Sequence, residues 1–130
     1  MDLSHGIDMA EVPRIRSLLE RHGDRFLNRI FTRTEQSYAK RFRDPAERLA
    51  GRFAAKEAVF KLFGTGWSEA LNWTDIEVVN NPKGQPAVRL YGHARALAEQ
   101  LGIRQISISI THTRDFAIAS VVASLHHEGQ

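Results

Sequence analysis

The chain has 130 residues, of which 42% are hydrophobic, and its 18 basic and 15 acidic side chains give a net charge of +3. The absence of cysteine excludes disulfides and thiolate metal sites, and no apolar run is long enough to span a membrane or to act as a signal peptide. We therefore expect one cytoplasmic domain over residues 1–130, without membrane association.

The N-terminal third predicts one strand and three short helices. Alternating residues predict the strand over 3–9, with Leu3, Ile7 and Met9 on its apolar side. Apolar residues at helical spacing predict helices over 13–21 and 26–31. Thr32 and Glu35 then have the spacing of a capping box, which predicts a third short helix that ends before residue 44.

A long helix is predicted to begin after residue 44 and to end near residue 64. Asp44 suits its N-cap, Pro45 its first position and Glu47 a reciprocal capping bond. Gly64 and Gly66 supply the end, because glycine readily adopts the backbone conformation that terminates a helix.

Three charged side chains lie in or beside the apolar face of this helix. Lys56 falls within the apolar arc, and Glu57 and Lys61 lie together on its shoulder. One interpretation is a surface pair of Glu57 with Lys61, with the Lys56 ammonium reaching water along its own stem. The other is a phosphate site beside a Gly-Thr-Gly turn, in which the carboxylate holds a metal ion and the ammonium groups contact oxygens. Spacing leaves the two evenly balanced.

The second half of the chain predicts antiparallel strands and one further helix. Strands are expected over 76–79 and 87–90, a helix over 91–101, and strands over 106–111 and 116–125 joined by a turn at 113–115. Residues 126–130 are expected to fray. Helices followed by antiparallel hairpins indicate an α+β fold with its antiparallel sheet packed against the long helix.

Basic residues are concentrated near the N-terminus, where nine lie between Arg14 and Arg43 against three acidic residues. The planar guanidinium of arginine suits carboxylate or phosphate. This segment therefore predicts an acidic partner, which could be a nucleic acid, a phosphorylated ligand or an acidic protein. A solvated helical face is the alternative interpretation.

Two residues outside the long helix are candidates for the same chemistry. If the first strand runs beside the long helix, Asp8 and Glu57 supply the two oxygen ligands that Mg²⁺ typically takes from protein. His112 ends a strand, where a histidine is either a core residue or a group that contacts phosphate or transfers protons. Zinc is disfavoured, because His112 would be its only nitrogen ligand.

Three blocks together resemble the holo-[acyl-carrier-protein] synthase family of small, single-domain 4'-phosphopantetheinyl transferases. Residues 6–8 resemble its Gly-aliphatic-Asp signature, residues 52–61 its Lys-Glu-Ala-x-x-Lys helix, and residues 107–113 its Ser-x-[Ser/Thr]-His strand. The blocks keep the family order and spacing over nearly the whole chain. Two departures are visible, since Ser4 replaces a frequent glycine and Gln85 replaces the lysine usual before Pro86.

The resemblance implies an enzyme of bacterial fatty-acid synthesis. It would transfer 4'-phosphopantetheine from coenzyme A to a serine of apo-acyl carrier protein and release adenosine 3',5'-bisphosphate. Asp8 and Glu57 would hold Mg²⁺, Lys61 would complete the catalytic group, and either Glu57 or a water on the metal would take the serine proton. The implied contacts to coenzyme A are Arg52 at the 3'-phosphate, Lys56 and Lys61 at the pyrophosphate, and Gly64, Gly66, Pro86 and His112 around the rest of the molecule.

The resemblance also implies two protein partners. The acidic carrier protein would dock on the basic segment through Arg14, Arg21, Arg25 and Phe26. Family members form trimers with active sites between subunits, so we expect a homotrimer in which a neighbouring chain contributes part of the coenzyme A pocket.

Two alternative functions follow from the residues without the resemblance. A basic RNA-binding domain would track phosphates with its arginines, but Phe53, Phe60 and Phe63 follow a helical core stripe rather than a stacking platform, so no nucleic-acid partner is expected. A metal-dependent nucleotide or pyrophosphate hydrolase would use the same acid and lysines with water as the nucleophile. Its products would distinguish it from a transferase.

Overall fold

The computed structural model describes residues 2–64 and 71–126. Every predicted helix and strand is present, which confirms the α+β fold; Gly66 and residues 127–130 lie outside the described part. The elements in chain order are β1 (Asp2–Glu11), α1 (Val12–His22), α2 (Asp24–Ile30), α3 (Arg33–Ala39), α4 (Pro45–Leu62), the 3₁₀ helix η1 (Trp73–Asp75), β2 (Ile76–Asn80), β3 (Pro86–Leu90), α5 (Gly92–Gln100), β4 (Ile103–His112) and β5 (Phe116–Leu125).

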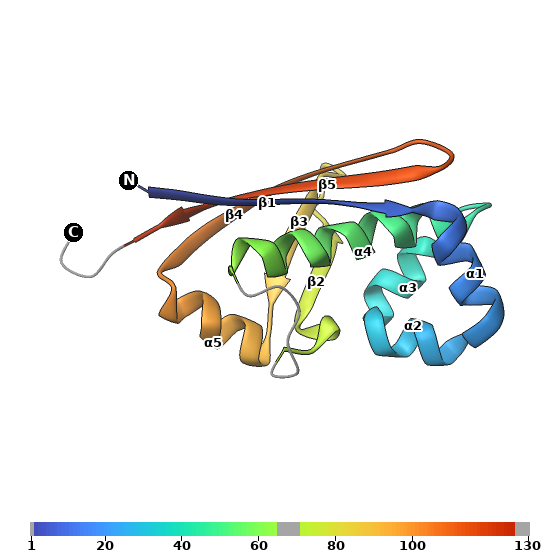
Figure 1. Ribbon diagram of the computed structural model, residues 1–130, viewed down its shortest axis with the longest axis horizontal. Helices are drawn as coiled ribbons and strands as arrows, with labels where there is room; N and C mark the ends of the chain where they lie inside the picture. Colours follow the sequence, from blue (N-terminus) through green and yellow to red (C-terminus); the bar gives the residue numbers. More distant parts are fainter. Residues whose placement is uncertain (1, 65–70, 127–130) are drawn as a thin grey trace.

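Two antiparallel sheets are present in the described residues. The larger has the strand order β1-β5-β4, so that β1 and β4 are its edges, and β2 pairs with β3 in the smaller one. Figure 1 shows α4 running along the long strands, with the helices on one side of the larger sheet. Within the described ranges, no helix is long and apolar enough to cross a membrane.

Small residues allow α4 to pack very closely against β1. A Cβ atom added at Gly6 would lie only 2.1 Å from the carbonyl oxygen of Ala58 on α4. Glycine is therefore required at this position, because any side chain would push the strand away from the helix. Asp8 lies two residues further along the same side of β1, so the contact at Gly6 also places Asp8 beside α4. Buried small residues continue this packing on α4, at Ala54 and Ala55, and on the neighbouring strand β5, at Ala117, Ala119, Val121 and Ala123.

The opposite face of the larger sheet is apolar and exposed in a single chain. Leu3 is 66% exposed, and Ile7 and Met9 are each 54% exposed. Met9 lies opposite Ile118 in the register of β1 with β5, which extends the same apolar surface. The apolar side of the predicted first strand therefore faces away from the helices. We call this surface the outer sheet face; its exposed large residues are Leu3, Ile7, Met9, Phe116, Ile118 and Val122.

The ends of α4 follow the predicted signals with one exception. The Asp44 side chain accepts a hydrogen bond from the Ala46 amide at 3.3 Å, and Gly64 follows the helix with a φ of +82°. The reciprocal capping bond predicted for Glu47 is wrong, because its carboxylate is turned toward β4. There the Glu47 Oε2 atom lies 3.7 Å from His112 Nδ1.

Candidate active site

Two predicted carboxylates and one predicted lysine come together where β1 crosses α4. Asp8 projects from β1 toward Glu57 on α4, and its Oδ1 atom lies 3.5 Å from Lys61 Nζ. Lys61 Nζ also donates a hydrogen bond to the carbonyl oxygen of Ile7 at 3.1 Å. Lys61 follows Glu57 by one helical turn, so α4 presents both toward the edge strand. We call Asp8, Glu57 and Lys61 the acidic cluster.

The electrostatics of the acidic cluster favour a bound proton or cation. Burial raises the pKa of Glu57 to about 7, and the charge of Asp8 and a hydrogen bond with it act in the same direction; Arg14 and Lys61 oppose the shift. Two neighbouring carboxylates repel each other, so a cation placed between them is stabilised by both. The shifted pKa therefore marks a place where a positive charge is stabilised.

The donor set of the acidic cluster fits Mg²⁺. Carboxylate oxygens are the hard ligands that Mg²⁺ prefers, and this ion usually keeps several waters and phosphate oxygens in its coordination sphere. Over residues 2–64 and 71–126, no group of three or more histidine, aspartate and glutamate side chains is arranged to hold a metal ion. An ion at Asp8 and Glu57 would thus leave most of its positions for substrate and water.

Lys56 lies in the core, and this placement contradicts its predicted contact with pyrophosphate. Its side chain is fully buried, with Nζ 2.8 Å from Glu35 Oε1. Nζ also donates to the carbonyl oxygens of Trp73 at 3.0 Å and Ile76 at 2.5 Å. An ammonium group has three protons, and these three acceptors use all of them. The alternative in which the ammonium reaches water is wrong for the same reason.

A second group of predicted residues surrounds a pocket of about 170 Å³ beside α4, and Arg52, Pro86 and His112 all line it. We call it the Arg52 pocket. The Arg52 side chain is 5% exposed, its guanidinium lies 3.9 Å above the Tyr38 ring, and Nη2 donates to Asn80 Oδ1 at 2.5 Å. The buried Nε atom has no hydrogen-bond partner, and burial lowers the pKa of Arg52. An anion in this pocket would compensate that desolvation.

Arg48 belongs to the same pocket although sequence reasoning did not select it. Its Nη1 atom lies 3.0 Å from His112 Nε2, and its guanidinium lies 3.9 Å above the Phe42 ring. Arginine can only donate, so Nε2 is the acceptor in this contact, and Nδ1 faces the Glu47 carboxylate. The available signal was spacing, because Arg48 precedes Arg52 by one turn on the same face of the helix.

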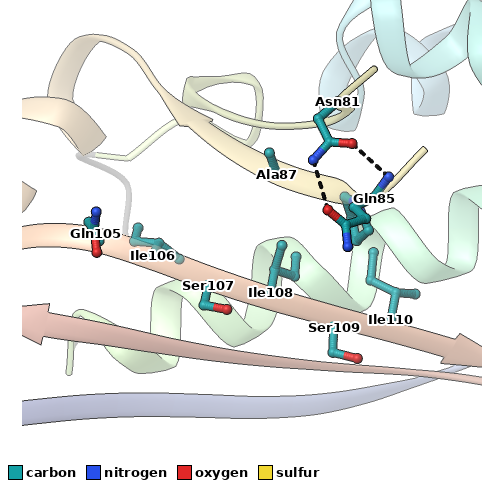
Figure 2. Close-up of a pocket in the computed structure, with 10 residues that line it drawn as sticks. Asn81, Gln85, Ala87, Gln105, Ile106, Ser107, Ile108, Ser109 and Ile110 are labelled. Atoms are coloured by element: carbon teal, nitrogen blue, oxygen red, sulfur yellow. Dashed lines mark hydrogen bonds between the residues drawn. The ribbon is translucent and has the colours of Figure 1, made fainter. Parts of the chain in front are cut away.

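A wider pocket of about 600 Å³ adjoins the Arg52 pocket, and the two share Pro86 and Ile110 as lining residues. Figure 2 shows it between β4 and the loop before β3. In that loop, Asn81 Nδ2 donates to Gln85 Oε1 at 3.1 Å, and the Gln85 amide donates to Asn81 Oδ1 at 2.9 Å. Gln85, one of the two departures from the family pattern, therefore stabilises the loop that lines this pocket. The other departure, Ser4, donates to the Leu62 carbonyl oxygen at 3.2 Å.

One chain does not bring all the predicted site residues together. The acidic cluster lies at the β1 edge of the larger sheet, with Gly64 just beyond it at the end of α4. The Arg52 pocket lies at the other edge, since His112 is the last residue of β4 and β5 separates the two edge strands. Figure 1 shows this separation of β1 from β4 by β5.

Two of the four residues predicted to dock an acidic partner, Arg25 and Phe26, line a groove of about 490 Å³ between α1, α2, α4 and η1. Arg14, Arg21 and Arg25 are exposed, and Phe26 is half-buried at the groove. Phe53, which lines the groove, precedes Glu57 by one turn of α4, so the groove lies about one helical turn from the acidic cluster. Sequence reasoning missed Trp73, which follows the undescribed residues 65–70. We call this the α1–α2 groove; it is lined by Leu18, His22, Arg25, Phe26, Arg29, Ile30, Phe53 and Trp73.

Comparisons with known proteins agree with this architecture. Residues 4–121 match the model of the 4'-phosphopantetheinyl transferase superfamily. The chain is 46% identical over 122 residues to the holo-[acyl-carrier-protein] synthase of Solibacter usitatus, a match that covers 94% of this chain and 98% of that relative.

Solved structures show the same likeness. The crystal structure of Helicobacter pylori holo-[acyl-carrier-protein] synthase in complex with coenzyme A is 33% identical, with a TM-score of 0.82, covering 92% of this chain and 99% of that one. The Bacillus anthracis holo-(acyl-carrier-protein) synthase in complex with CoA (3',5'-ADP) is 36% identical, with a TM-score of 0.75 and coverage of 92% and 94%.

These matches span most of the chain at substantial identity, so the chain belongs to the 4'-phosphopantetheinyl transferase superfamily. Within that class of enzymes it is a member of the holo-[acyl-carrier-protein] synthase family, which confirms the family that its three sequence blocks predicted.

Proposed function

We propose that this enzyme transfers 4'-phosphopantetheine from coenzyme A to a serine of apo-acyl carrier protein, with Mg²⁺ as cofactor and adenosine 3',5'-bisphosphate as the second product. The observation that carries the proposal is the acidic cluster. Asp8 from β1 and Glu57 from α4 lie together with Lys61. The close contact of Gly6 with α4, which leaves no room for a side chain, fixes the distance between the strand and the helix that carry them.

The chemistry of this step depends mainly on position and charge. Phosphoryl transfer passes through a state with charge spread over the phosphate oxygens, so neutralisation and alignment supply most of the acceleration. Asp8 and Glu57 would hold Mg²⁺, which supplies positive charge at the pyrophosphate when it is bound. Lys61 and Arg14, both close enough to lower the pKa of Glu57, add further positive charge. The Glu57 carboxylate, or a water molecule beside it, would accept the serine proton.

The Arg52 pocket is the proposed site for the adenosine end of coenzyme A. A phosphomonoester there would pair with Arg52, which has an unused Nε, and with Arg48. Both guanidiniums are stacked on aromatic rings, so little side-chain entropy is lost when they bind an anion. His112 and Pro86 complete the lining.

The carrier protein is proposed to dock over the α1–α2 groove. Arg21 and Arg25 are exposed cations that would meet acidic side chains of the carrier, and Phe26 offers an apolar contact beside them. Because Phe53 in the groove precedes Glu57 by one helical turn, a carrier seated there would bring its serine toward Glu57.

A homotrimer with active sites between subunits accounts for two further observations. The outer sheet face exposes six large apolar side chains, which favours burial against other copies of the chain. The acidic cluster and the Arg52 pocket lie at opposite edges of the sheet, so a neighbouring subunit's pocket would complete the site. Light scattering after size exclusion tests this proposal, and a monomer at micromolar concentration would contradict it.

Intact-mass spectrometry of the carrier tests the proposed reaction. The enzyme, coenzyme A, Mg²⁺ and an apo-carrier should give a carrier heavier by one phosphopantetheine, with the modification on a serine. A hydrolase would instead release free phosphopantetheine and leave the carrier mass unchanged, which would refute the transfer. Omitting Mg²⁺ in the presence of a chelator should stop the reaction.

A further inference from the structure

The buried pair of Lys56 and Glu35 joins four separate segments of the chain. Besides contacting Lys56, the Glu35 carboxylate accepts hydrogen bonds from the Thr32 amide at 2.9 Å and the Val78 amide at 2.8 Å. Thr32 and Glu35 form the predicted capping box of α3, so the Glu35 carboxylate links the start of α3 to β2. Lys56 links this carboxylate to α4, and its hydrogen bond to the Trp73 carbonyl oxygen connects η1 as well.

Trp73 of η1 is held by three residues on one face of α4. Its indole stacks on Phe53, with ring centroids 5.1 Å apart and an interplanar angle of 16°. The Phe60 ring meets the indole edge to face at 5.0 Å. Lys56 lies between these phenylalanines on the helix, and its Nζ atom binds the Trp73 carbonyl oxygen at 3.0 Å. Backbone and side chain of Trp73 are therefore both set by α4.

Energetics argue that this pair has a role beyond stability. Removing a lysine and a carboxylate from water carries a large desolvation cost, and apolar residues of similar volume often stabilise a core as well or better. All three Lys56 protons and both Glu35 oxygens are nevertheless used in directed bonds. Directed bonds specify where the joined segments lie, which apolar packing does less strictly.

We propose that Lys56 is a positioning residue for carrier binding: through the Trp73 carbonyl it holds the indole that forms one wall of the α1–α2 groove. This inference rests on the proposed docking of the carrier protein in that groove. Lys56 itself touches neither substrate, because it is fully buried. Its loss should weaken carrier binding far more than coenzyme A binding.

The test uses two variants in a Trp67→Phe background, where Trp73 is the one remaining tryptophan of the chain. Lys56→Met keeps an unbranched side chain of similar length but removes the three hydrogen bonds. Lys56→Met/Glu35→Gln also removes the unpaired buried carboxylate, so it is the variant to use where the single change unfolds the protein. Circular dichroism and thermal melts establish which variants fold.

We expect a folded Lys56 variant to raise the carrier KM about tenfold, while kcat and the coenzyme A KM stay within about twofold. Trp73 emission should shift to longer wavelength and become more accessible to acrylamide. An unchanged carrier KM in a folded variant would overturn the inference. An equal rise in the coenzyme A KM would overturn it as well, because that pattern reports general damage rather than a displaced groove wall.

Arg21→Glu separates this inference from the proposed docking itself. If Arg21→Glu leaves the carrier KM unchanged, the docking proposal fails; if it raises that KM and the Lys56 variants do not, only the role of Lys56 fails. Should neither Lys56 variant fold, titration of the Trp67→Phe protein with apo-carrier decides. A change in Trp73 emission supports the placement of this wall at the docking surface, and no change overturns it.

Discussion

Replacing Gly6 with alanine tests whether the contact between β1 and α4 sets the active geometry. The added Cβ would lie 2.1 Å from the Ala58 carbonyl oxygen and 3.0 Å from the Leu62 amide nitrogen. Nonbonded carbon contacts are optimal at about 3.5–4.0 Å, so β1 must move away from α4 by roughly 1 Å or more. Asp8 lies on the same side of β1 and would move away from Glu57 with the strand.

The expected magnitude follows from that displacement. A misplacement of about 1 Å can lower a reaction rate about 100-fold, so we expect kcat of Gly6→Ala to fall by roughly that factor. Overpacking of a close interface costs about 1–3 kcal/mol, so the free energy of unfolding should fall without loss of the fold. Initial rates of carrier modification and urea denaturation measure the two effects.

Ser4→Ala is the matched control on the same side of β1. It removes the hydrogen bond from Ser4 to the Leu62 carbonyl oxygen, which is 3.2 Å long, but adds no atom to the interface. It should cost about 1 kcal/mol of stability and keep kcat near that of the unmodified enzyme. A folded Gly6→Ala enzyme with full activity would refute the reasoning, as would an equal loss of kcat in Ser4→Ala.

Three further predictions address the two halves of the proposed site. Glu57→Gln and Asp8→Asn should each lower kcat by at least about 100-fold in the rate assay. Both variants should melt at or above the temperature of the unmodified protein, because each relieves repulsion between the two carboxylates. A large loss of stability would contradict a functional role for these residues. In metal-free protein, the pKa of Glu57 near 7 means that protonation stabilises the fold, so the free energy of unfolding should fall as the pH rises from 4.5 to about 7. Denaturation of Glu57→Gln at several pH values should not show this trend, and calorimetry should find weaker Mg²⁺ binding to the unmodified enzyme below pH 7. If neither the stability nor the Mg²⁺ affinity of the unmodified enzyme changes with pH, the raised pKa of Glu57 is contradicted. Asp8→Asn and Arg52→Gln, each inactive alone, should regain activity when the two proteins are unfolded and refolded together, and failure of the refolded mixture would contradict a site shared between chains.

Sequence reasoning predicted the elements and the acidic cluster because both depend on local signals. Asp44 and Pro45 mark the start of α4, and the structure has them at the N-cap and first position. Asp8 and Glu57 came from short motifs whose side chains face each other once β1 lies beside α4. The alternating residues predicted β1 correctly. They did not show which side of β1 packs against α4, because that depends on the close fit of Gly6 against Ala58.

Long-range partners account for what sequence reasoning missed. Lys56 sits in the apolar arc of α4, and nothing in its neighbourhood along the chain shows that Glu35, 21 residues earlier, comes to within 2.8 Å of it. The capping box explains Glu35 from local sequence alone, but its bonds to the Val78 amide and to Lys56 form only once β2 and α4 pack against α3. Glu47 fits a capping pattern equally well but is drawn to His112 across the fold.

The stoichiometry of adenosine 3',5'-bisphosphate tests the central claim most directly. With enzyme, coenzyme A and Mg²⁺, we predict one mole of this product for each mole of carrier modified, and none without carrier or with a carrier whose acceptor serine is replaced by alanine. Product formed at the same rate without the carrier would contradict the account, because the acidic cluster would then activate water rather than a serine hydroxyl.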